Sequence, residues 1–225
     1  MWDQSMEEYI STYISKLLKK KFGKGPETCR TTKSGNYLVT HIQGFLTPME
    51  DILLQQGQYK YVDQARKVII NHILEEIKGV VQVTLKFDVK DHYHDWNFLH
   101  NSGIIIFVFE GNDTPSVKPE IDIGRLEKEI ARITCLVQKV PDYITTYPIS
   151  PSTYLVERSG IFIQIEKALI EKGFQKELLL TKDELEKNYF YRYGRFEDIF
   201  HKSVKDIFID WNIKEDKSLM AFILN

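Results

Sequence analysis

Val89–Asn97 reads VKDHYHDWN, and Val204–Asn212 reads VKDIFIDWN. Six of the nine positions are identical, at an offset of 115 residues. Each copy is followed by 13 residues that end in an apolar run. A repeat at a fixed spacing indicates one structural unit written twice. The sequence therefore predicts a tandem duplication, with one unit over residues 1–112 and a second, divergent unit over residues 120–225.

The same order of elements is predicted in each unit: a helix, a hairpin, a short helix, a long helix and a second hairpin. Apolar residues three and four apart indicate a helix over residues 5–22. Thr47-Pro48-Met49-Glu50 is typical of a helix start, because the threonine suits the N-cap and the glutamate follows three residues later. Four short strands with helices on one face predict a two-layer α+β domain. Two such copies predict a pseudo-two-fold pair, the fused form of a homodimer.

One boundary of each long helix is predicted, the first from the repeat and the second from a capping pattern. Residues 81–87 alternate as a strand does, but the equivalent residues 196–202 have a helical pattern. We therefore predict that the first long helix continues through about Lys86, followed by a strand over 88–96. In the second unit, Thr181-Lys182-Asp183-Glu184 has the pattern of a capping box and predicts that the long helix begins there. Gly111–Pro119 is typical of a linker.

Composition limits the classes of function. A hydrophobic content of 43% and a charged content of 28% are typical of a soluble globular protein. The net charge of −2 provides no general attraction for nucleic acid. The apolar runs are too short to span a bilayer, and Met1–Gln4 lacks the start of a secretory signal. Because Cys29 and Cys135 form no disulfide framework and no metal-ligand spacing, we expect a cytoplasmic protein without a cofactor.

The loop that contains Lys24, Gly25 and Arg30 is a candidate anion-binding site. Glycine exposes backbone N–H groups, and lysine and arginine supply positive charge. The spacing is not that of a P-loop, and the same residues also suit a helix end followed by a strand. Cys29 lies beside Arg30, which would lower the pKa of its thiol.

The repeated stretch itself contains two further candidates. His92 and His94 would point to the same face of a strand, as zinc ligands can, but the second copy has isoleucine at both positions, which favours packing instead. The repeated triplets suit turns beside the core, or else paired carboxylates whose pKa values are shifted. These triplets are Asp95, Trp96 and Asn97, and Asp210, Trp211 and Asn212.

The first unit resembles a family of small bacterial domains. The matching residues are Gly23–Pro26, Arg30, Gly44–Glu50, Ala65-Arg66, Asp95 and Ile105–Phe109. On these residues the unit is similar to the MpsC-like family, named for a membrane-potential-generating system. The second unit retains Lys139, Pro141, Glu166 and Asp210 but has lost the Leu-Thr-Pro of the first. The chain contains two copies of the domain, whereas most members of the family have one.

The resemblance implies a soluble accessory of a membrane system that handles cations or bicarbonate. We therefore expect a non-enzymatic regulatory protein that contacts an integral membrane protein, with no nucleic-acid partner and with further homo-oligomers possible. The alternative is a module or enzyme that binds a small anion, bicarbonate or a phosphate ester, through the loop from Lys24 to Arg30.

Overall fold

The computed structural model describes residues 4–111, 113–115 and 117–225. Asn112 and Ser116 of the predicted linker lie outside the described residues. So do residues 1–3 of the N-terminal stretch considered as a secretory signal. Contacts divide the chain into two compact units. The first unit contains the residues up to His92 and Trp96–Asp113, and the second contains Tyr93–Asp95 and Thr114–Asn225.

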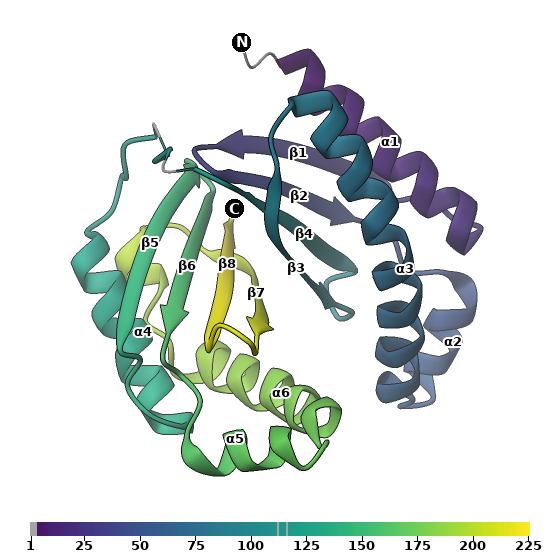
Figure 1. Cartoon of the computed structure of the whole chain (residues 1–225). Coiled ribbons are helices and arrows are strands. Elements are labelled where there is room, and N and C mark those ends of the chain that lie inside the picture. The colour runs from purple at the N-terminus through teal and green to yellow at the C-terminus, as the bar shows by residue number, and fades with distance from the viewer. Residues whose placement is uncertain (1–3, 112, 116) are drawn as a thin grey trace. The chain divides into compact units, whose positions relative to one another are not determined.

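The first half of the chain runs helix, two strands, two helices and two strands (Figure 1). Its elements are α1 (Gln4–Phe22), β1 (Thr28–Ser34), β2 (Tyr37–Gln43), α2 (Pro48–Gln55), α3 (Tyr59–Leu85), β3 (Val89–Asn97) and β4 (Ser102–Phe109).

The second half repeats this order and adds one short helix before its last two strands. Its elements are α4 (Ile123–Val137), β5 (Tyr143–Ser150), β6 (Thr153–Ser159), α5 (Gln164–Glu171), α6 (Gln175–Tyr193), α7 (Glu197–Phe200), β7 (Val204–Asn212) and β8 (Lys217–Leu224).

Within the described residues, the strands form two four-stranded antiparallel sheets, in the orders β1-β2-β4-β3 and β5-β6-β8-β7. The registers also correspond. Ile42 lies opposite Gly103 in the first sheet, and the equivalent Arg158 lies opposite Ser218 in the second. The predicted mixed α+β fold with two similar halves is therefore confirmed. The pseudo-two-fold arrangement of the two copies stays a prediction.

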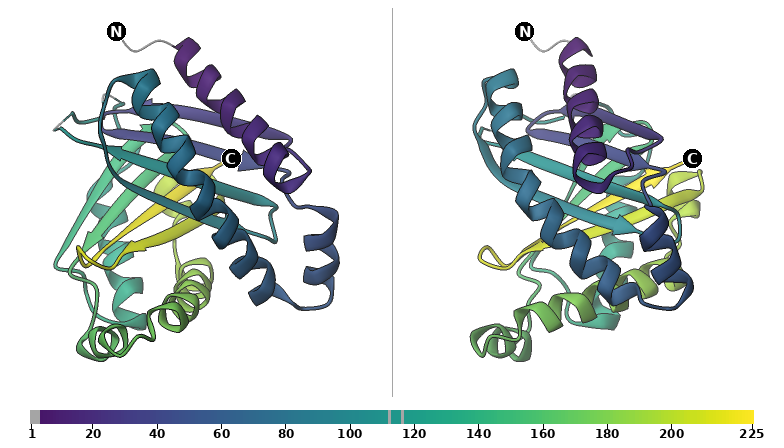
Figure 2. Two further views of the ribbon diagram at one scale, coloured as in Figure 1. Left: turned by 45° about the vertical axis from the view of Figure 1, so that its right-hand side comes forward. Right: turned by 90° about the vertical axis from the view of Figure 1, so that its right-hand side faces the viewer.

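The first core lies between one face of its sheet and helices α1 and α3 (Figure 2). Ile10 and Ile14 of α1 and Ile73 and Ile77 of α3 have no solvent exposure, because these spacings of four place them on one face of each helix. Phe107 of β4 lies in the same cluster. The predicted apolar stripe of the first helix is thus the face that packs on the sheet.

The second core is built in the same way from α4, α6 and the face of β6, β7 and β8, with more aromatic side chains. Phe196, Phe200 and Phe222 are in contact, with ring centroids 4.8 to 6.5 Å apart. Offset and edge-on rings at these distances stabilise a core beyond the area that they bury.

One loop geometry occurs in both halves and positions the short helices. The Asn101 side chain accepts hydrogen bonds from the N–H groups of Phe45 and Leu46, at 2.8 and 2.6 Å. The equivalent Asp216 accepts from Ile161 and Phe162, both at 2.8 Å. Gly44 and Gly160 precede these segments with φ of 66° and 65°, a conformation that favours glycine.

The boundary predictions had different outcomes. The first long helix ends at Leu85, and Lys86 follows in the left-handed conformation, so the predicted extension through about Lys86 is confirmed. The equivalent His201 ends α7 in the same conformation.

The predicted start of the second long helix at Thr181 is wrong. Helix α6 begins at Gln175, directly after the Gly173-Phe174 turn, and Thr181 lies inside it, where its hydroxyl donates to the carbonyl of Glu177. The predicted helix over residues 196–202 is reduced to α7, because Gly194 is extended and ends α6. A Cβ at Gly194 would collide with the ring of Phe196 and the carbonyl oxygen of Phe190, so the position requires glycine.

Candidate functional site

The first unit contains a largely buried ion pair between α2 and α3. Arg66 of α3 donates to Glu50 of α2, from Nε at 2.9 Å and from Nη2 at 2.5 Å. Arg66 is only 3% exposed. The capping box positions Glu50, because its carboxylate also accepts from the N–H of Thr47. The helix start that the sequence predicts therefore also supplies one partner of this ion pair.

Aromatic rings surround the guanidinium of Arg66. Its Cζ lies 4.7 Å from the ring centroid of Phe45, 4.8 Å from Trp96, 5.4 Å from Phe98 and 5.5 Å from Phe22. Faces of aromatic rings attract a cation, most strongly where water is excluded. We name Glu50, Arg66 and these four rings the Arg66 cluster. It joins α1, α2, α3 and the turn after β3.

The second unit has an equivalent pair. Lys182 of α6, 116 residues after Arg66, donates to Glu166 of α5 at 2.8 Å. Its ammonium lies 5.2 Å from the ring of Phe162 and 5.9 Å from the ring of Trp211, the residue equivalent to Trp96. Both copies therefore keep a cation between a glutamate and the repeated tryptophan.

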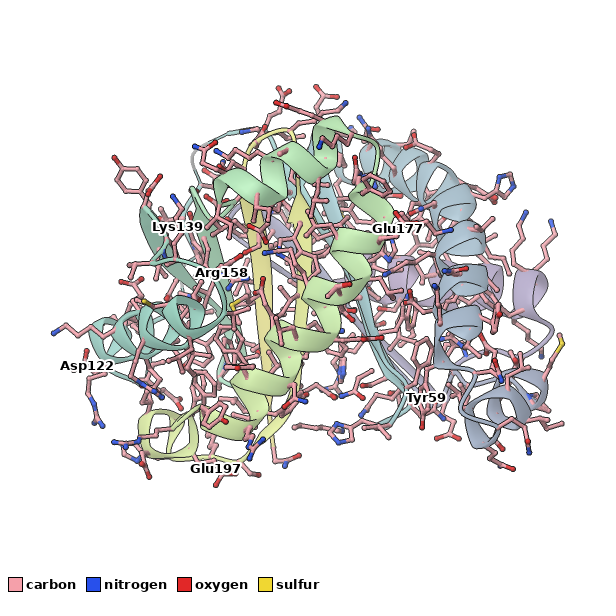
Figure 3. All side chains as sticks on the ribbon, turned by 90° about the horizontal axis from the view of Figure 1, so that it is seen from below. Tyr59, Asp122, Lys139, Arg158, Glu177 and Glu197 are labelled. Carbon is pink, nitrogen blue, oxygen red and sulfur yellow. The ribbon has the colours of Figure 1, made fainter. Side chains whose placement is uncertain are left out.

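The second unit also has a buried polar network that has no counterpart among the equivalent residues of the first. Arg158 of β6, labelled in Figure 3, donates to Ser218 at 2.8 Å, to Thr134 at 3.1 Å and to Glu186 at 2.6 Å. All four side chains are fully buried. Burial opposes ionisation of Glu186, but Arg158 and Lys182 together lower its pKa below the ordinary value. The first unit has Leu18, Ile42, Ile70 and Gly103 at these positions.

The residues of the predicted anion site lie at the end of α1 and on β1. The ammonium of Lys24 donates to the carbonyl of Leu46 at 2.9 Å, and Gly25 packs beside the Lys19 side chain. Arg30 is exposed on β1, where it lies opposite His41. Burial raises the pKa of the Cys29 thiol to about 12, so the expectation that Arg30 lowers it is wrong.

The candidates of the repeated stretch lie in β3 and β7. Within the second unit, Asp95 accepts from Lys187 at 2.7 Å and from the N–H of Ile209 at 2.8 Å. Burial raises the pKa of Asp95 to about 7, although Lys187 opposes the rise. Asp210 accepts from the N–H groups of His94 and Trp211, each at 2.8 Å.

The remaining residues of this stretch have local roles. Asn97 accepts from the N–H of His100, and Asn212 accepts from the N–H of Glu215, each at 3.2 Å. These bonds close the turns after β3 and β7. The ring of His92 lies 6.3 Å from Phe107. Among the described residues, no group of three or more His, Cys, Asp or Glu side chains is placed to hold a metal ion.

A shallow, open groove lies between α1 and α3 in the first unit. It has a volume of about 420 Å³ and is lined by Tyr9, Glu75, Glu76, Gly79, Val80, Val83 and Thr84. Val83 is 80% exposed and Tyr9 is 55% exposed. Glu76 accepts a hydrogen bond from the hydroxyl of Tyr13 at 2.8 Å. Burial, and then this hydrogen bond, raise the pKa of Tyr13 to about 12.

Sequence reasoning missed the Arg66 cluster, the buried network and the groove. One signal was present, because Glu50 and Glu166 recur at an offset of 116, as do the cations Arg66 and Lys182. The groove gives no such signal, because exposed apolar side chains such as Val68 also occur on α3 outside the groove.

Residues 3–111 match the family model described as "Na+-translocating membrane potential-generating system (MpsC)". No curated protein and no solved structure matches the chain. Within the part that the structure describes, no helix has the length and apolar character needed to cross a membrane. The match covers α1 to β4 and so includes the Arg66 cluster and the groove. The similarity to the MpsC family is therefore confined to residues 3–111, about the first half of the chain.

Proposed function

We propose that this chain is a cytoplasmic accessory or regulatory protein of a membrane system that generates a membrane potential or handles cations or bicarbonate. It acts by contact with an integral membrane protein. The family description supports the link to such a system. The groove between α1 and α3 is the observation that supports a protein contact. The exposed thiol of Cys135 suits a reducing compartment.

The chemistry of the groove favours one kind of occupant. Tyr9, Val80 and Val83 offer apolar surface, while Glu75 and Glu76 supply negative charge beside it. A Cβ at Gly79 would meet no other atom within 4 Å, so a partner backbone can approach α3 closely there. Amphipathic helices bind in grooves of this kind through their apolar face. We therefore expect the occupant to be an amphipathic helix of the membrane protein, with lysine or arginine opposite the two glutamates.

The test is affinity capture of the full chain from detergent-solubilised membranes, with proteins identified by mass spectrometry. Val83→Asp places a charge in the groove. Val68→Asp is the matched control, because Val68 is 71% exposed on the same helix outside the groove. An integral membrane protein retained by the wild type and by Val68→Asp, but lost by Val83→Asp, supports the proposal.

Three outcomes would contradict it. One is the absence of any integral membrane protein, and another is retention that Val83→Asp leaves unchanged. The third is a wild-type dimer that Val83→Asp converts to a monomer, because the groove would then hold a second copy of the chain.

The alternative is binding of bicarbonate or a phosphate ester at Lys24, Gly25 and Arg30. The exposure of Arg30 is the observation that favours it. Thermal unfolding with bicarbonate, phosphate and nucleotides is the discriminating measurement. A stabilisation lost in Arg30→Ala, but kept in a variant of the exposed Arg125 on α4, would favour this alternative. No shift with any of these anions would exclude it.

A further inference from the structure

The end of α1 and the start of α2 together form a surface that combines positive charge with exposed apolar side chains. Lys19, Lys20 and Lys21 are exposed in the last turn of α1. Met49 and Ile52, three residues apart on α2, are 73% and 62% exposed. We name these five residues the α1–α2 surface.

The two parts of this surface are held next to each other. The ring of Phe22, the last residue of α1, lies 4.9 Å from the ring of Phe45, just before α2. Lys24 donates to the carbonyl of Leu46 at 2.9 Å. Figures 1 and 2 show the end of α1 beside α2 in each view. The Arg66 cluster holds both α2, through Glu50, and the end of α1, through Phe22. The lysines and the apolar residues therefore keep the same position relative to each other.

We propose that the α1–α2 surface binds the surface of an anionic lipid bilayer. This inference rests on the proposed function, which assigns the chain to a membrane system. Exposed lysines beside large apolar side chains are the combination that binds anionic membranes, because the cations meet the lipid phosphates while the apolar side chains enter the headgroup boundary. Lysine suits this role, since its long stem reaches past its own helix.

The arrangement of the lysines fits a contact with an extended surface. Consecutive residues are about 100° apart around a helix, so the three ammonium groups spread across the exposed part of the last turn. One cation there would suffice to interact with the helix dipole. The exposed acidic residues nearest in sequence are Glu27 and Asp51, while Glu50 is paired with Arg66. Lys16 and Lys24 add further positive charge, so the region is positive although the whole chain is not.

The second unit provides an internal comparison. Its positions equivalent to the three lysines hold Cys135, Leu136 and Val137. Ile165, equivalent to Met49, is also exposed, but Ala168 replaces Ile52. The exposed tip of the short helix is thus common to both copies, and the combination with the lysines belongs to the first.

The experiment is co-sedimentation of the full chain with vesicles of phosphatidylcholine, with and without phosphatidylglycerol. We expect binding to the anionic vesicles at about 0.1 M salt and loss of binding at about 1 M salt, where the Debye length falls from about 10 Å to about 3 Å. Replacing the three lysines by glutamine should lower the partition coefficient about a hundredfold. Replacing Met49 and Ile52 by serine should lower it about tenfold.

Two control variants remove similar groups elsewhere. Lys172→Gln with Lys176→Gln removes exposed lysines of the second unit, and Ile165→Ser removes the equivalent apolar side chain. Both should leave vesicle binding unchanged. Circular dichroism of every variant establishes that it is folded, and all the replaced side chains are exposed.

The proposal is overturned if the wild type does not bind anionic vesicles at the lower salt concentration. It is also overturned if the lysine variant or the serine variant binds as well as the wild type, or if a control variant loses binding equally. Binding of duplex DNA that depends on the lysines, without vesicle binding, would assign the surface to nucleic acid instead. The proposed function is tested separately, because capture of a membrane protein depends on Val83 in the groove and is done in detergent without vesicles.

Discussion

Arg66 and Lys182 occupy equivalent positions, on α3 and α6, and each forms an ion pair with the glutamate of the preceding short helix. Arginine and lysine differ in shape, so the feature that both copies retain is a buried positive charge between two helices. We infer that the ion pair sets how the short helix packs on the long one.

The first prediction concerns these glutamates. Glu50→Gln should lower the unfolding free energy of the first unit by about 2–3 kcal/mol, because the buried Arg66 loses its counter-charge. Glu166→Gln should lower that of the second unit by less, about 1–2 kcal/mol, because Lys182 still has Glu186 at 3.1 Å. Glutamine still suits the capping box, so the change isolates the charge. Hydrogen exchange followed by mass spectrometry resolves peptides of each unit and measures the effect.

Exposed acids on the same short helices are the controls. Asp51→Asn on α2 and Glu171→Gln on α5 should change stability by no more than about 0.5 kcal/mol. Equal effects of Glu50→Gln and Asp51→Asn would show that the ion pair makes no special contribution.

The second prediction is a pH dependence at Asp216. Burial raises the pKa of its carboxyl, but the N–H groups of Phe162 and Ile161 together with Lys167 outweigh this and lower it below its ordinary value. A lowered pKa stabilises the fold above the unfolded value of about 3.9, and this stability is lost as the pH falls through the lower, folded value. Asp216→Asn should therefore flatten the acid side of the stability curve of the second unit.

The measurement is urea unfolding between pH 3 and pH 7, followed by Trp211 fluorescence in a chain whose other tryptophans are phenylalanine. The reverse change is the control. Asn101 is the residue equivalent to Asp216, but the first unit has Asp51 at the position equivalent to Lys167. Asn101→Asp therefore introduces the carboxylate without its lysine partner. It should destabilise the first unit at neutral pH, through repulsion between like charges. Fluorescence of Trp96, in a chain whose other tryptophans are phenylalanine, follows the unfolding of that unit. An unchanged pH profile in Asp216→Asn would refute the role of this carboxylate.

The third prediction separates the two thiols. Cys135 is exposed, whereas burial raises the pKa of Cys29 to about 12. Since the thiolate is the reactive form, we expect a disulfide reagent at about pH 8 to modify Cys135 within minutes and Cys29 only after unfolding. Counting the thiols modified before and after adding denaturant tests this, and Cys135→Ser should remove the fast phase. Rapid modification of native Cys135→Ser would mean that Cys29 is accessible.

The sequence predicted the architecture well because duplicated segments constrain each other. Residues 81–87 alternate like a strand, yet the helical pattern of residues 196–202 led to the helix end that the structure has at Leu85. The same reasoning failed where the copies differ. Gly79 lies inside α3, whereas Gly194, 115 residues later, is extended and ends α6.

The candidate sites were less predictable, because they depend on partners from different elements. Glu50 reads as a capping residue, and nothing in its local pattern shows that Arg66, 16 residues later, returns to it. Arg158 lies in a strand, where an arginine normally faces solvent. Its burial depends on Thr134, Glu186 and Ser218, which lie 24, 28 and 60 residues away.

The fourth prediction exchanges the core of one copy for that of the other. A variant with Thr134→Leu, Arg158→Ile, Glu186→Ile and Ser218→Gly carries the residues of the first unit at the network positions. Replacing a buried ion pair by packed apolar residues is often neutral or stabilising by about 1–4 kcal/mol. We expect the same here, because Lys182 keeps Glu166 as its partner. Urea unfolding of the second unit, followed by Trp211, gives the change.

The single variant Glu186→Ile is the necessary comparison. It leaves the guanidinium of Arg158 buried without its carboxylate, which should cost about 3–5 kcal/mol. The network is then costly to break at one point and easy to replace as a whole. If the fourfold variant is as unstable as the single one, the second unit depends on the polar network itself. In that case the core of the second unit can no longer accept the residues of the first unit at these positions.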